Sequence, residues 1–257
     1  MKIKKKTIGI LGVGQLSEFI LEGINNKKTE YEFILSPRSK DRSSKLGTKF
    51  NYKIAQSNQA VLDSCQMILV CLPSDSSEKI LSELNFRKNH NIMSTMAGVS
   101  RERLREITKT SNICVSMMPG YANINGNGPI AMHPFDKNWD EFFSFLGPVL
   151  TLETKKEFDI AATFGALSGV SFIYLQTLIN WYVSKGLDQN SAKVLVLQTF
   201  SGNIDAITNQ HNDLNSIIDS VSTKGGITEK LALELKNDRA LEAWPDALDK
   251  ILISIKK

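Results

Sequence analysis

The chain has 257 residues, of which 42% are hydrophobic and 23% charged, and its formal net charge at pH 7 is +4. These values are typical of globular proteins, and they exclude a disordered tail protein, a collagen-like repeat and a small scaffold that needs disulfides or metals to fold. Positive residues are scattered and are not interleaved with aromatic ones, so we predict no nucleic-acid partner.

The beginning of the chain does not have the pattern of a targeting signal. A basic run over residues 2–6 is followed by a short, glycine-containing apolar stretch that polar residues close from Gln15 onward. We find no window of roughly 18 uninterrupted apolar residues, as a membrane helix requires. Cys65, Cys71 and Cys114 lack CxxC and Cys/His spacing, which favours buried reduced thiols over disulfides or zinc. We therefore expect a cytoplasmic protein without a membrane partner or a metal.

Short apolar segments bounded by turn residues alternate with helical spacing in the first part of the chain. These segments are residues 7–12, 32–36, 66–72, 91–95 and 113–117, with 128–132 and 148–152 after them. Strands that are apolar on both faces need a sheet covered on both sides. The repetition of strand and helix therefore predicts an α/β fold in which residues 1–154 form a Rossmann-like, doubly wound, mainly parallel sheet.

A glycine-rich turn follows the first expected strand and opens the first expected helix. It reads Gly12-Val13-Gly14-Gln15-Leu16-Ser17. Gly12 permits a tight turn, and Gly14 lets the backbone approach a pyrophosphate on the free amides of the helix. Ser17 stands where a third glycine is usual, and its small side chain still allows close packing of helix on strand. We interpret the turn as a dinucleotide site and hold an ordinary glycine turn as the weaker alternative.

The residues after the second expected strand indicate which nucleotide binds. An acidic residue there would accept a hydrogen bond from the ribose of NAD, but the chain reads Leu35-Ser36-Pro37-Arg38-Ser39. A guanidinium and two hydroxyls suit a ribose 2′-phosphate, so NADPH is the predicted cofactor and NADH the less favoured one. The alternative for Arg38 is a solvated loop charge.

From residue 155 onward, turn signals become sparse and helical patterns run over 158–185 and 189–210. Residues 155–257 are therefore predicted to form an all-helical domain, with Gly186 ending one long helix and Asp188 capping the next. The segment Ile160–Trp181 is apolar nearly all round, which is more than one globular neighbour covers. We predict that a second subunit covers it, in a homodimer or a higher oligomer.

A second glycine-rich turn lies near the C-terminus and reads Val221-Ser222-Thr223-Lys224-Gly225-Gly226-Ile227-Thr228. Paired glycines with hydroxyls at a helix start provide exposed amides and a favourable dipole, which suit a carboxylate. From these residues alone, a plain connection between two helices is an equally good interpretation.

Several short motifs occur in a common order: Gly12–Leu16, Ser36–Ser39, Ala97–Val99, Met118–Pro119, Ala166–Gly169 with Tyr174 after it, and Val221–Thr228. In their order and spacing they resemble the pyrroline-5-carboxylate reductase family over nearly the whole chain. The resemblance implies an NADPH-dependent oxidoreductase that reduces the C=N bond of a cyclic imino acid, with 1-pyrroline-5-carboxylate to L-proline as the first candidate. Proline biosynthesis and an intertwined dimer through the C-terminal helices are implied with it.

The resemblance also implies roles for particular residues. Substrate-binding residues are Thr223, Lys224, Gly225, Gly226, Ile227 and Thr228, with Thr228 as the catalytic residue nearest the imine nitrogen and the site completed across the dimer interface. The full set of predicted cofactor-binding residues is Gly12, Gly14, Gln15, Leu16, Ser36, Arg38, Ser39, Leu72, Pro73, Ala97 and Gly98. Hydride reduction of an imine needs orientation and an anchored substrate but no nucleophile or metal. His90, His133 and His211 are expected in loop or surface-like settings without a catalytic role.

Three positions depart from the family pattern. Gly120-Tyr121 follows Met118-Pro119 where the family has asparagine, Ser171-Phe172 stands where it has a Gly-Pro pair, and Lys224 replaces a proline. The first two departures leave open a different cyclic or N-substituted imine as substrate. They also leave open a dimer that binds NADPH without turnover.

Two other enzyme classes fit less well. A 3-hydroxyacid dehydrogenase of the phosphogluconate type needs a lysine four residues before an asparagine on the long helix, and Asn180 has Gln176 at that position. A deazaflavin-dependent reductase would share the nucleotide turn but would not explain the helical half.

Overall fold

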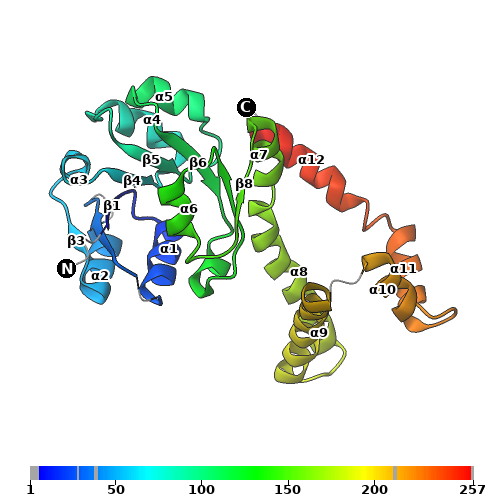
Figure 1. Ribbon diagram of the computed structural model, residues 1–257. Coiled ribbons are helices and arrows are strands. Elements are labelled where there is room, and N and C mark those ends of the chain that lie inside the picture. Colours follow the sequence, from blue (N-terminus) through cyan, green and yellow to red (C-terminus); the bar gives the residue numbers. More distant parts are fainter. Residues whose placement is uncertain (1–5, 28, 38–39, 211–212, 256–257) are drawn as a thin grey trace. The chain divides into compact units, whose positions relative to one another are not determined.

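The computed structural model describes residues 6–27, 29–37, 40–210 and 213–255 (Figure 1). The chain forms two compact units, the first comprising Met1–Ala166 with Leu252–Lys257 and the second Leu167–Ile251. The first unit thus extends beyond the boundary that we expected after residue 154, because helix α7 (Lys155–Ala162) packs against strand β7 (Ile130–His133) of the sheet.

An eight-stranded sheet forms the centre of the first unit, in the order β3-β2-β1-β4-β5-β6-β7-β8. Neighbouring strands are parallel except β6 and β7, which are antiparallel. The remaining strands are β1 (Lys6–Leu11), β2 (Tyr31–Leu35), β3 (Lys53–Ile54), β4 (Met67–Val70), β5 (Asn91–Ser94), β6 (Ile113–Met117) and β8 (Val149–Thr151). This confirms the predicted doubly wound, mainly parallel sheet. The sequence pattern missed β3, which has only two residues and exposes both.

Helices cover both faces of this sheet, as the apolar strands require. The core on one face includes residues of α1 (Gln15–Asn25), α2 (Lys40–Phe50) and α6 (Lys137–Phe143). The core on the other face includes residues of α3 (Asn58–Ser64), α4 (Ser74–Ser82) and α5 (Arg101–Thr108), with Phe158 of α7 packed against it. A short 3-10 helix, η1 (Tyr121–Asn125), follows β6 and packs against α1.

A buried polar network fixes α6 against the sheet. The indole Nε1 of Trp139 donates to Asn91 Oδ1 over 2.8 Å, and Asn91 Nδ2 donates to Asp136 Oδ2 over 2.9 Å. The other oxygen of Asp136 caps α6 by accepting from the amides of Asn138 and Trp139. The largest buried side chain of the protein therefore has its one polar atom satisfied, as burial of an indole requires.

The second unit is helical, with most of α8 (Gly165–Ser184), then α9 (Gln189–Gln210), α10 (Leu214–Val221), α11 (Ile227–Asn237) and the larger part of α12 (Ala243–Ile255). The helix expected over 158–185 is divided, because a turn at residues 163–164 separates α7 from α8. Gly186 follows α8 with a left-handed φ of 99°, and Asp188 Oδ1 accepts from the amides of Asn190 and Ser191. Both agree with the predicted end and cap.

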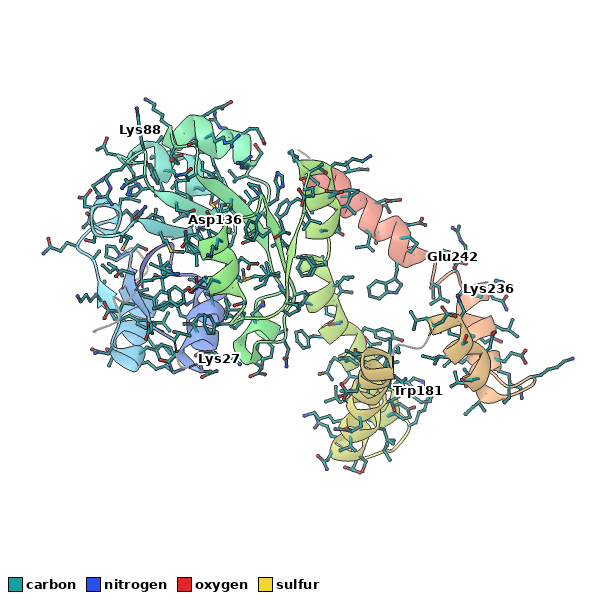
Figure 2. All side chains as sticks on the ribbon, viewed as in Figure 1. Lys27, Lys88, Asp136, Trp181, Lys236 and Glu242 are labelled. Atoms are coloured by element: carbon teal, nitrogen blue, oxygen red, sulfur yellow. The ribbon has the colours of Figure 1, made fainter. Side chains whose placement is uncertain are left out.

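The buried core of the second unit is small. It consists of Ile179, Ala192 and Val196 with a few partly buried neighbours. Apolar side chains on α8 remain exposed in the single chain, among them Ile173 at 67% and Trp181 at 55%. Trp181 is labelled in Figure 2. The sequence has no uninterrupted run of about 18 apolar residues, but by length and average composition alone the stretch Lys155–Ser184 is apolar enough to cross a membrane. An exposed apolar surface of this extent marks an interaction site in a protein that folds in water.

Three free thiols lie in the first unit. Cys65 and Cys114 are buried and Cys71 is half-buried. Burial raises the pKa of the Cys65 thiol to about 11 and the pKa values of Cys71 and Cys114 to about 12. Such thiols stay protonated at neutral pH, which suits a structural role. In the described part of the chain, no group of three or more His, Cys, Asp or Glu residues is placed to hold a metal ion.

His90 lies in a loop before β5, as expected, but is not surface-like, and for His133, which lies within strand β7, the expected setting was wrong. His90 is fully buried, and the backbone amide of Arg87 donates to its Nδ1 while its Nε2 donates to the Leu62 carbonyl. His133 is also buried, with Nδ1 donating to the Leu152 carbonyl over 2.8 Å. Both rings connect backbone segments. His211 lies outside the described residues.

His90 is expected to make the protein less stable in mild acid. Burial lowers its pKa below the usual 6.5, and the neutral ring alone can both accept from Arg87 and donate to Leu62. The unfolded chain binds the proton near pH 6.5 and the folded chain resists it, so the free energy of unfolding is full above that pH and falls as the pH drops below it. Urea unfolding from about pH 7 to about pH 5 should show a smaller loss for His90→Gln than for the parent chain. An equal loss in both would contradict this role.

Candidate active site

The predicted cofactor residues gather at the carboxyl edge of the parallel strands. The chain adds β2 and β3 on one side of β1 and then crosses to β4 on the other, so the order of strands reverses between β1 and β4. Ligands of such sheets bind at this switch point. Backbone hydrogen bonds connect the strand ends: Ser36 N to Ile10 O at 3.0 Å, Cys71 N to Leu11 O at 2.8 Å and Thr95 N to Val70 O at 3.0 Å.

Gly12 forms the tight turn that the sequence predicted. Its φ is +91°, and a Cβ there would lie 2.6 Å from the Cys71 carbonyl oxygen. Both the backbone conformation and the space exclude any other residue. The amide of Gly12 donates to the Ser36 hydroxyl over 3.1 Å, which joins the turn to the end of β2.

Gly14 is the N-cap of α1, and its setting differs from that of Gly12. Its φ of −98° is open to any residue, and a Cβ there would meet nothing within 4 Å. Glycine is therefore not required by the chain itself, which is expected where a ligand must approach the backbone. The first-turn amides of α1 lack carbonyl partners one turn earlier, so they can donate to an anion. The turn thus fits a pyrophosphate.

Ser17 fills the place of the third glycine. Its side chain is fully buried, and its hydroxyl donates to the Gly14 carbonyl over 2.9 Å. The small residue allows close packing of α1 on the sheet, as the sequence predicted, and the hydroxyl adds a bond that a glycine could not make.

The end of β2 holds Ser36, whose side chain is buried and whose carbonyl accepts from Ser43 Oγ over 2.9 Å. Arg38 and Ser39 lie outside the described residues, so their predicted roles stay predictions. The sequence analysis missed Arg42, in the first part of α2. Its Nη2 lies 3.4 Å from Gln15 Oε1 and its Nε 3.3 Å from Glu18 Oε2, beside the glycine turn.

Further predicted cofactor residues follow β4 and β5. Leu72 is buried, and Pro73 is the exposed N-cap of α4. Ala97 and Gly98 are exposed after β5, where Gly98 has a φ of +77°. Leu16 is partly buried against the core of the α1 face, which limits its contact with a ligand to the exposed part of its side chain.

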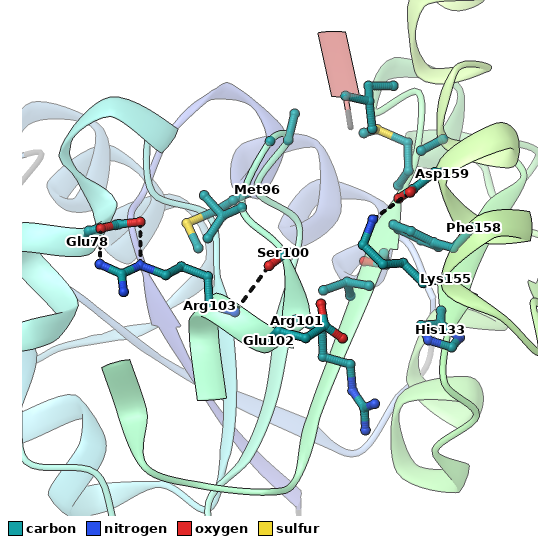
Figure 3. Close-up of a pocket in the computed structure, with 18 residues that line it drawn as sticks. Glu78, Met96, Ser100, Arg101, Glu102, Arg103, His133, Lys155, Phe158 and Asp159 are labelled. Atoms are coloured by element: carbon teal, nitrogen blue, oxygen red, sulfur yellow. Dashed lines mark hydrogen bonds and ion pairs between the residues drawn. The ribbon is translucent and has the colours of Figure 1, made fainter. Parts of the chain in front are cut away.

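Ala97 and Gly98 are among the residues that line a cavity of about 450 Å³. Figure 3 shows Met96, Ser100 and Phe158 around it. The start of α5, the end of β6 and one face of α7 line it, and Phe158 contributes apolar surface. Lys155 and Asp159, one turn apart on α7, form an ion pair of 2.5 Å at its wall. The cavity has both charged and apolar lining, and sequence reasoning gave no signal for it beyond the Ala-Gly pair.

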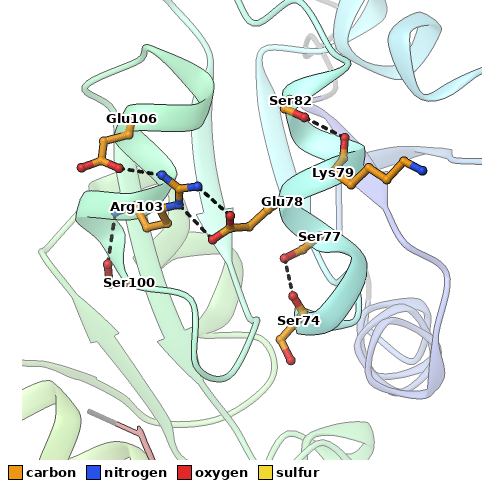
Figure 4. A network of polar contacts seen from close by, with 8 residues as sticks. All are labelled: Ser74, Ser77, Glu78, Lys79, Ser82, Ser100, Arg103 and Glu106. Carbon is orange, nitrogen blue, oxygen red and sulfur yellow. Dashed lines mark hydrogen bonds and ion pairs between the residues drawn. The ribbon is translucent and has the colours of Figure 1, made fainter. Parts of the chain in front are cut away.

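An arginine holds the two helices beside this cavity together. Arg103 of α5 donates from Nε and Nη2 to both carboxylate oxygens of Glu78 on α4, at 2.9 and 2.7 Å, and from Nη1 to Glu106 (Figure 4). The hydrogen bonds from Arg103 lower the pKa of Glu78. A two-pronged pair of this kind fixes geometry as well as charge. We infer that it fixes the spacing of α4 and α5 at the cavity.

The departure at Gly120 has a structural cause within this chain. Gly120 has a φ of +78°, and a Cβ there would lie 3.0 Å from the Phe19 ring. Its amide donates to Asn123 Oδ1 over 2.9 Å, and the buried Asn123 donates from Nδ2 to the carbonyls of Gly128 and Leu146. Asn123 therefore organises this loop, a role that sequence analysis did not assign.

The predicted substrate loop lies in the second unit, between α10 and α11. Gly225 has a φ of +75°, and a Cβ on Gly226 would lie 2.6 Å from Thr223 Oγ1, so the turn requires both glycines. The amide of Gly226 donates to the Thr223 carbonyl over 2.9 Å. Lys224, Ile227 and Thr228 are exposed, and Thr228 lies in the first turn of α11. The glycine turn that the sequence predicted is present, and the substrate-binding roles of its residues stay predictions.

In a comparison with known protein families, the nucleotide-binding half and the helical half of the chain match two different families. Residues 156–256 match the family described as pyrroline-5-carboxylate reductase dimerisation, and residues 7–98 match the family described as NADP oxidoreductase coenzyme F420-dependent. A pyrroline-5-carboxylate reductase from Vibrio alginolyticus is 24% identical over 252 residues, covering 93% of this chain and 92% of its own. Residues 156–256 therefore belong to the pyrroline-5-carboxylate reductase dimerisation family, and the whole chain is similar to pyrroline-5-carboxylate reductases.

Solved structures of the family share its fold over almost the full length. A 1-pyrroline-5-carboxylate reductase from Streptococcus pyogenes has a TM-score of 0.86 at 21% identity, covering 97% of this chain and 98% of its own. A pyrroline carboxylate reductase from Plasmodium falciparum, solved with NADP bound, has a TM-score of 0.87 at 19% identity, covering 99% and 98%.

These comparisons confirm the predicted family and fold, and the class of oxidoreductase acting on C=N bonds with an NADP cofactor. They disfavour the deazaflavin-dependent alternative. The family described as coenzyme F420-dependent matches residues 7–98, but the helical half matches the reductase dimerisation family. The individual site residues stay predictions.

Proposed function

We propose that this family member reduces 1-pyrroline-5-carboxylate to L-proline with NADPH. The match of residues 156–256, which include the Thr223–Thr228 loop, to the pyrroline-5-carboxylate reductase dimerisation family carries the proposal. The glycine turn at the switch point of the sheet supports the cofactor part of it.

In this proposal, the first unit binds the cofactor. The amides after Gly14 hold the pyrophosphate, and Arg38 and Ser39 hold the 2′-phosphate. The buried Ser36 positions the glycine turn through its bond with the Gly12 amide. NADPH supplies the hydride when bound. Ala97 and Gly98, exposed at the end of β5, would contact the nicotinamide.

The second unit binds the substrate. First-turn amides of α11 hold the carboxylate of the imino acid. The Thr228 hydroxyl donates its proton to the ring nitrogen as the ring carbon is reduced, and water restores the proton to the hydroxyl. We further propose a homodimer in which a second subunit covers the exposed apolar side chains of α8, including Ile173 and Trp181.

Assay of NADPH oxidation tests the proposal. The full-length protein should oxidise NADPH with 1-pyrroline-5-carboxylate more efficiently than with 1-pyrroline-2-carboxylate or larger cyclic imines. A higher kcat/KM for another imine would reassign the substrate, which the departures at Gly120 and Phe172 motivate. Saturable NADPH binding without oxidation of NADPH by any of these imines would instead indicate a non-catalytic dimer.

A further inference from the structure

The substrate loop already holds a carboxylate that belongs to the chain itself. Glu229, the third residue of α11, turns back toward the loop and accepts the backbone amide of Gly225 at Oε2 over 2.6 Å. This is a short bond of the kind that a charged acceptor makes. The carboxylate also lies in the first turn of α11, where the helix dipole favours negative charge.

Both glycine amides of the loop are therefore engaged within the chain. Gly225 donates to the Glu229 side chain, and Gly226 donates to the Thr223 carbonyl over 2.9 Å. The left-handed conformation of Gly225 sets the direction of its amide. A substrate carboxylate that approaches this amide must displace Glu229 or bind beside it, and two carboxylates at such a distance repel each other.

We propose that Glu229 determines substrate class by competing with the carboxylate of the imino acid. The inference rests on the proposed function, because it takes the Thr223–Thr228 loop as the substrate site. With Glu229 in place, the parent enzyme discriminates weakly between a cyclic imine that carries a carboxylate and the same ring without one. Removal of the Glu229 charge restores preference for the carboxylated ring.

The test compares 1-pyrroline-5-carboxylate with 1-pyrroline, which has the same ring and no carboxylate. Glu229→Gln removes the charge and keeps the shape, and Glu229→Ala also frees the Gly225 amide. We expect kcat/KM for 1-pyrroline-5-carboxylate to rise about tenfold in both variants, with a change below about twofold for 1-pyrroline. Glu234→Gln, which removes an exposed charge from the same helix, should change neither value.

An equal change for both imines, or no change, would overturn the inference. A second readout separates it from the proposed function. Calorimetric titration of L-proline into the protein with NADP⁺ measures carboxylate binding without turnover. If no variant oxidises NADPH, the proposed function fails, and tighter L-proline binding by Glu229→Ala than by the parent still supports the role of Glu229. Equal binding, or no binding by either, contradicts it.

Discussion

Replacement of Gly14 by alanine is expected to weaken NADPH binding about 10- to 100-fold and to leave the fold unchanged. The backbone at Gly14 has an ordinary φ of −98°, and a Cβ there meets no atom of the protein within 4 Å. The added methyl group would therefore occupy only the space through which a pyrophosphate approaches the amides of α1. Loss of a charged hydrogen bond of this kind is worth about 1.5–3 kcal/mol. Fluorescence titration of NADPH and thermal unfolding of the protein without cofactor measure the two effects separately.

Gly12→Ala serves as the contrasting variant. It forces a side chain into a left-handed conformation, 2.6 Å from the Cys71 carbonyl oxygen. We expect it to lower the free energy of unfolding by about 2–5 kcal/mol in addition to removing NADPH binding. Gly202→Ala on α9, where a Cβ also meets nothing within 4 Å, is the matched control and should bind NADPH normally. Unchanged NADPH affinity in Gly14→Ala would place the pyrophosphate elsewhere.

Replacement of Thr228 by alanine should lower kcat/KM for the preferred imine about 100-fold, because the hydroxyl is proposed to contact the ring nitrogen during proton transfer. NADPH affinity should not change, since Thr228 lies in the second unit and the glycine turn in the first. Steady-state kinetics with each substrate varied in turn provide the measurement.

Two further variants sharpen this test. Thr228→Ser keeps the hydroxyl and should retain most of the activity. Thr199→Ala removes an exposed threonine of α9, whose hydroxyl donates to the Leu195 carbonyl of the same helix. This control variant should leave kcat/KM unchanged. Full activity in Thr228→Ala would show that the imine nitrogen receives its proton from another source.

The first glycine turn and the exposed apolar helix could both be predicted from short local signals. The requirement for glycine at Gly12 is a matter of backbone conformation, so the turn was readable from the sequence and the structure explains it by a φ of +91°. The apolar character of Ile160–Trp181 likewise predicted a surface that a single chain leaves uncovered, and Trp181 is indeed 55% exposed. In both places, the residue type alone carries the physical requirement.

Other parts of the site depend on residues that are distant in the sequence. Asn123 is polar and lies in a loop, so nothing local indicated that it would be buried and connect Gly120, Gly128 and Leu146. The burial of His90 and His133 could not be predicted from the sequence either, because it results from the segments that pack around them. Burial is a property of the assembled chain, and composition does not reveal it.

Local patterns of the sequence determined the parallel sheet, the two glycine turns, the family and the cofactor class, because periodicity, glycine conformation and motif spacing are encoded within short segments. The tertiary structure alone decided that Arg42 lies beside the glycine turn, that α7 belongs to the first compact unit, and that Glu229 accepts the amide of Gly225. Hydrogen bonds and ion pairs act over about 3 Å. Which side chains come within that distance depends on the path of the whole backbone.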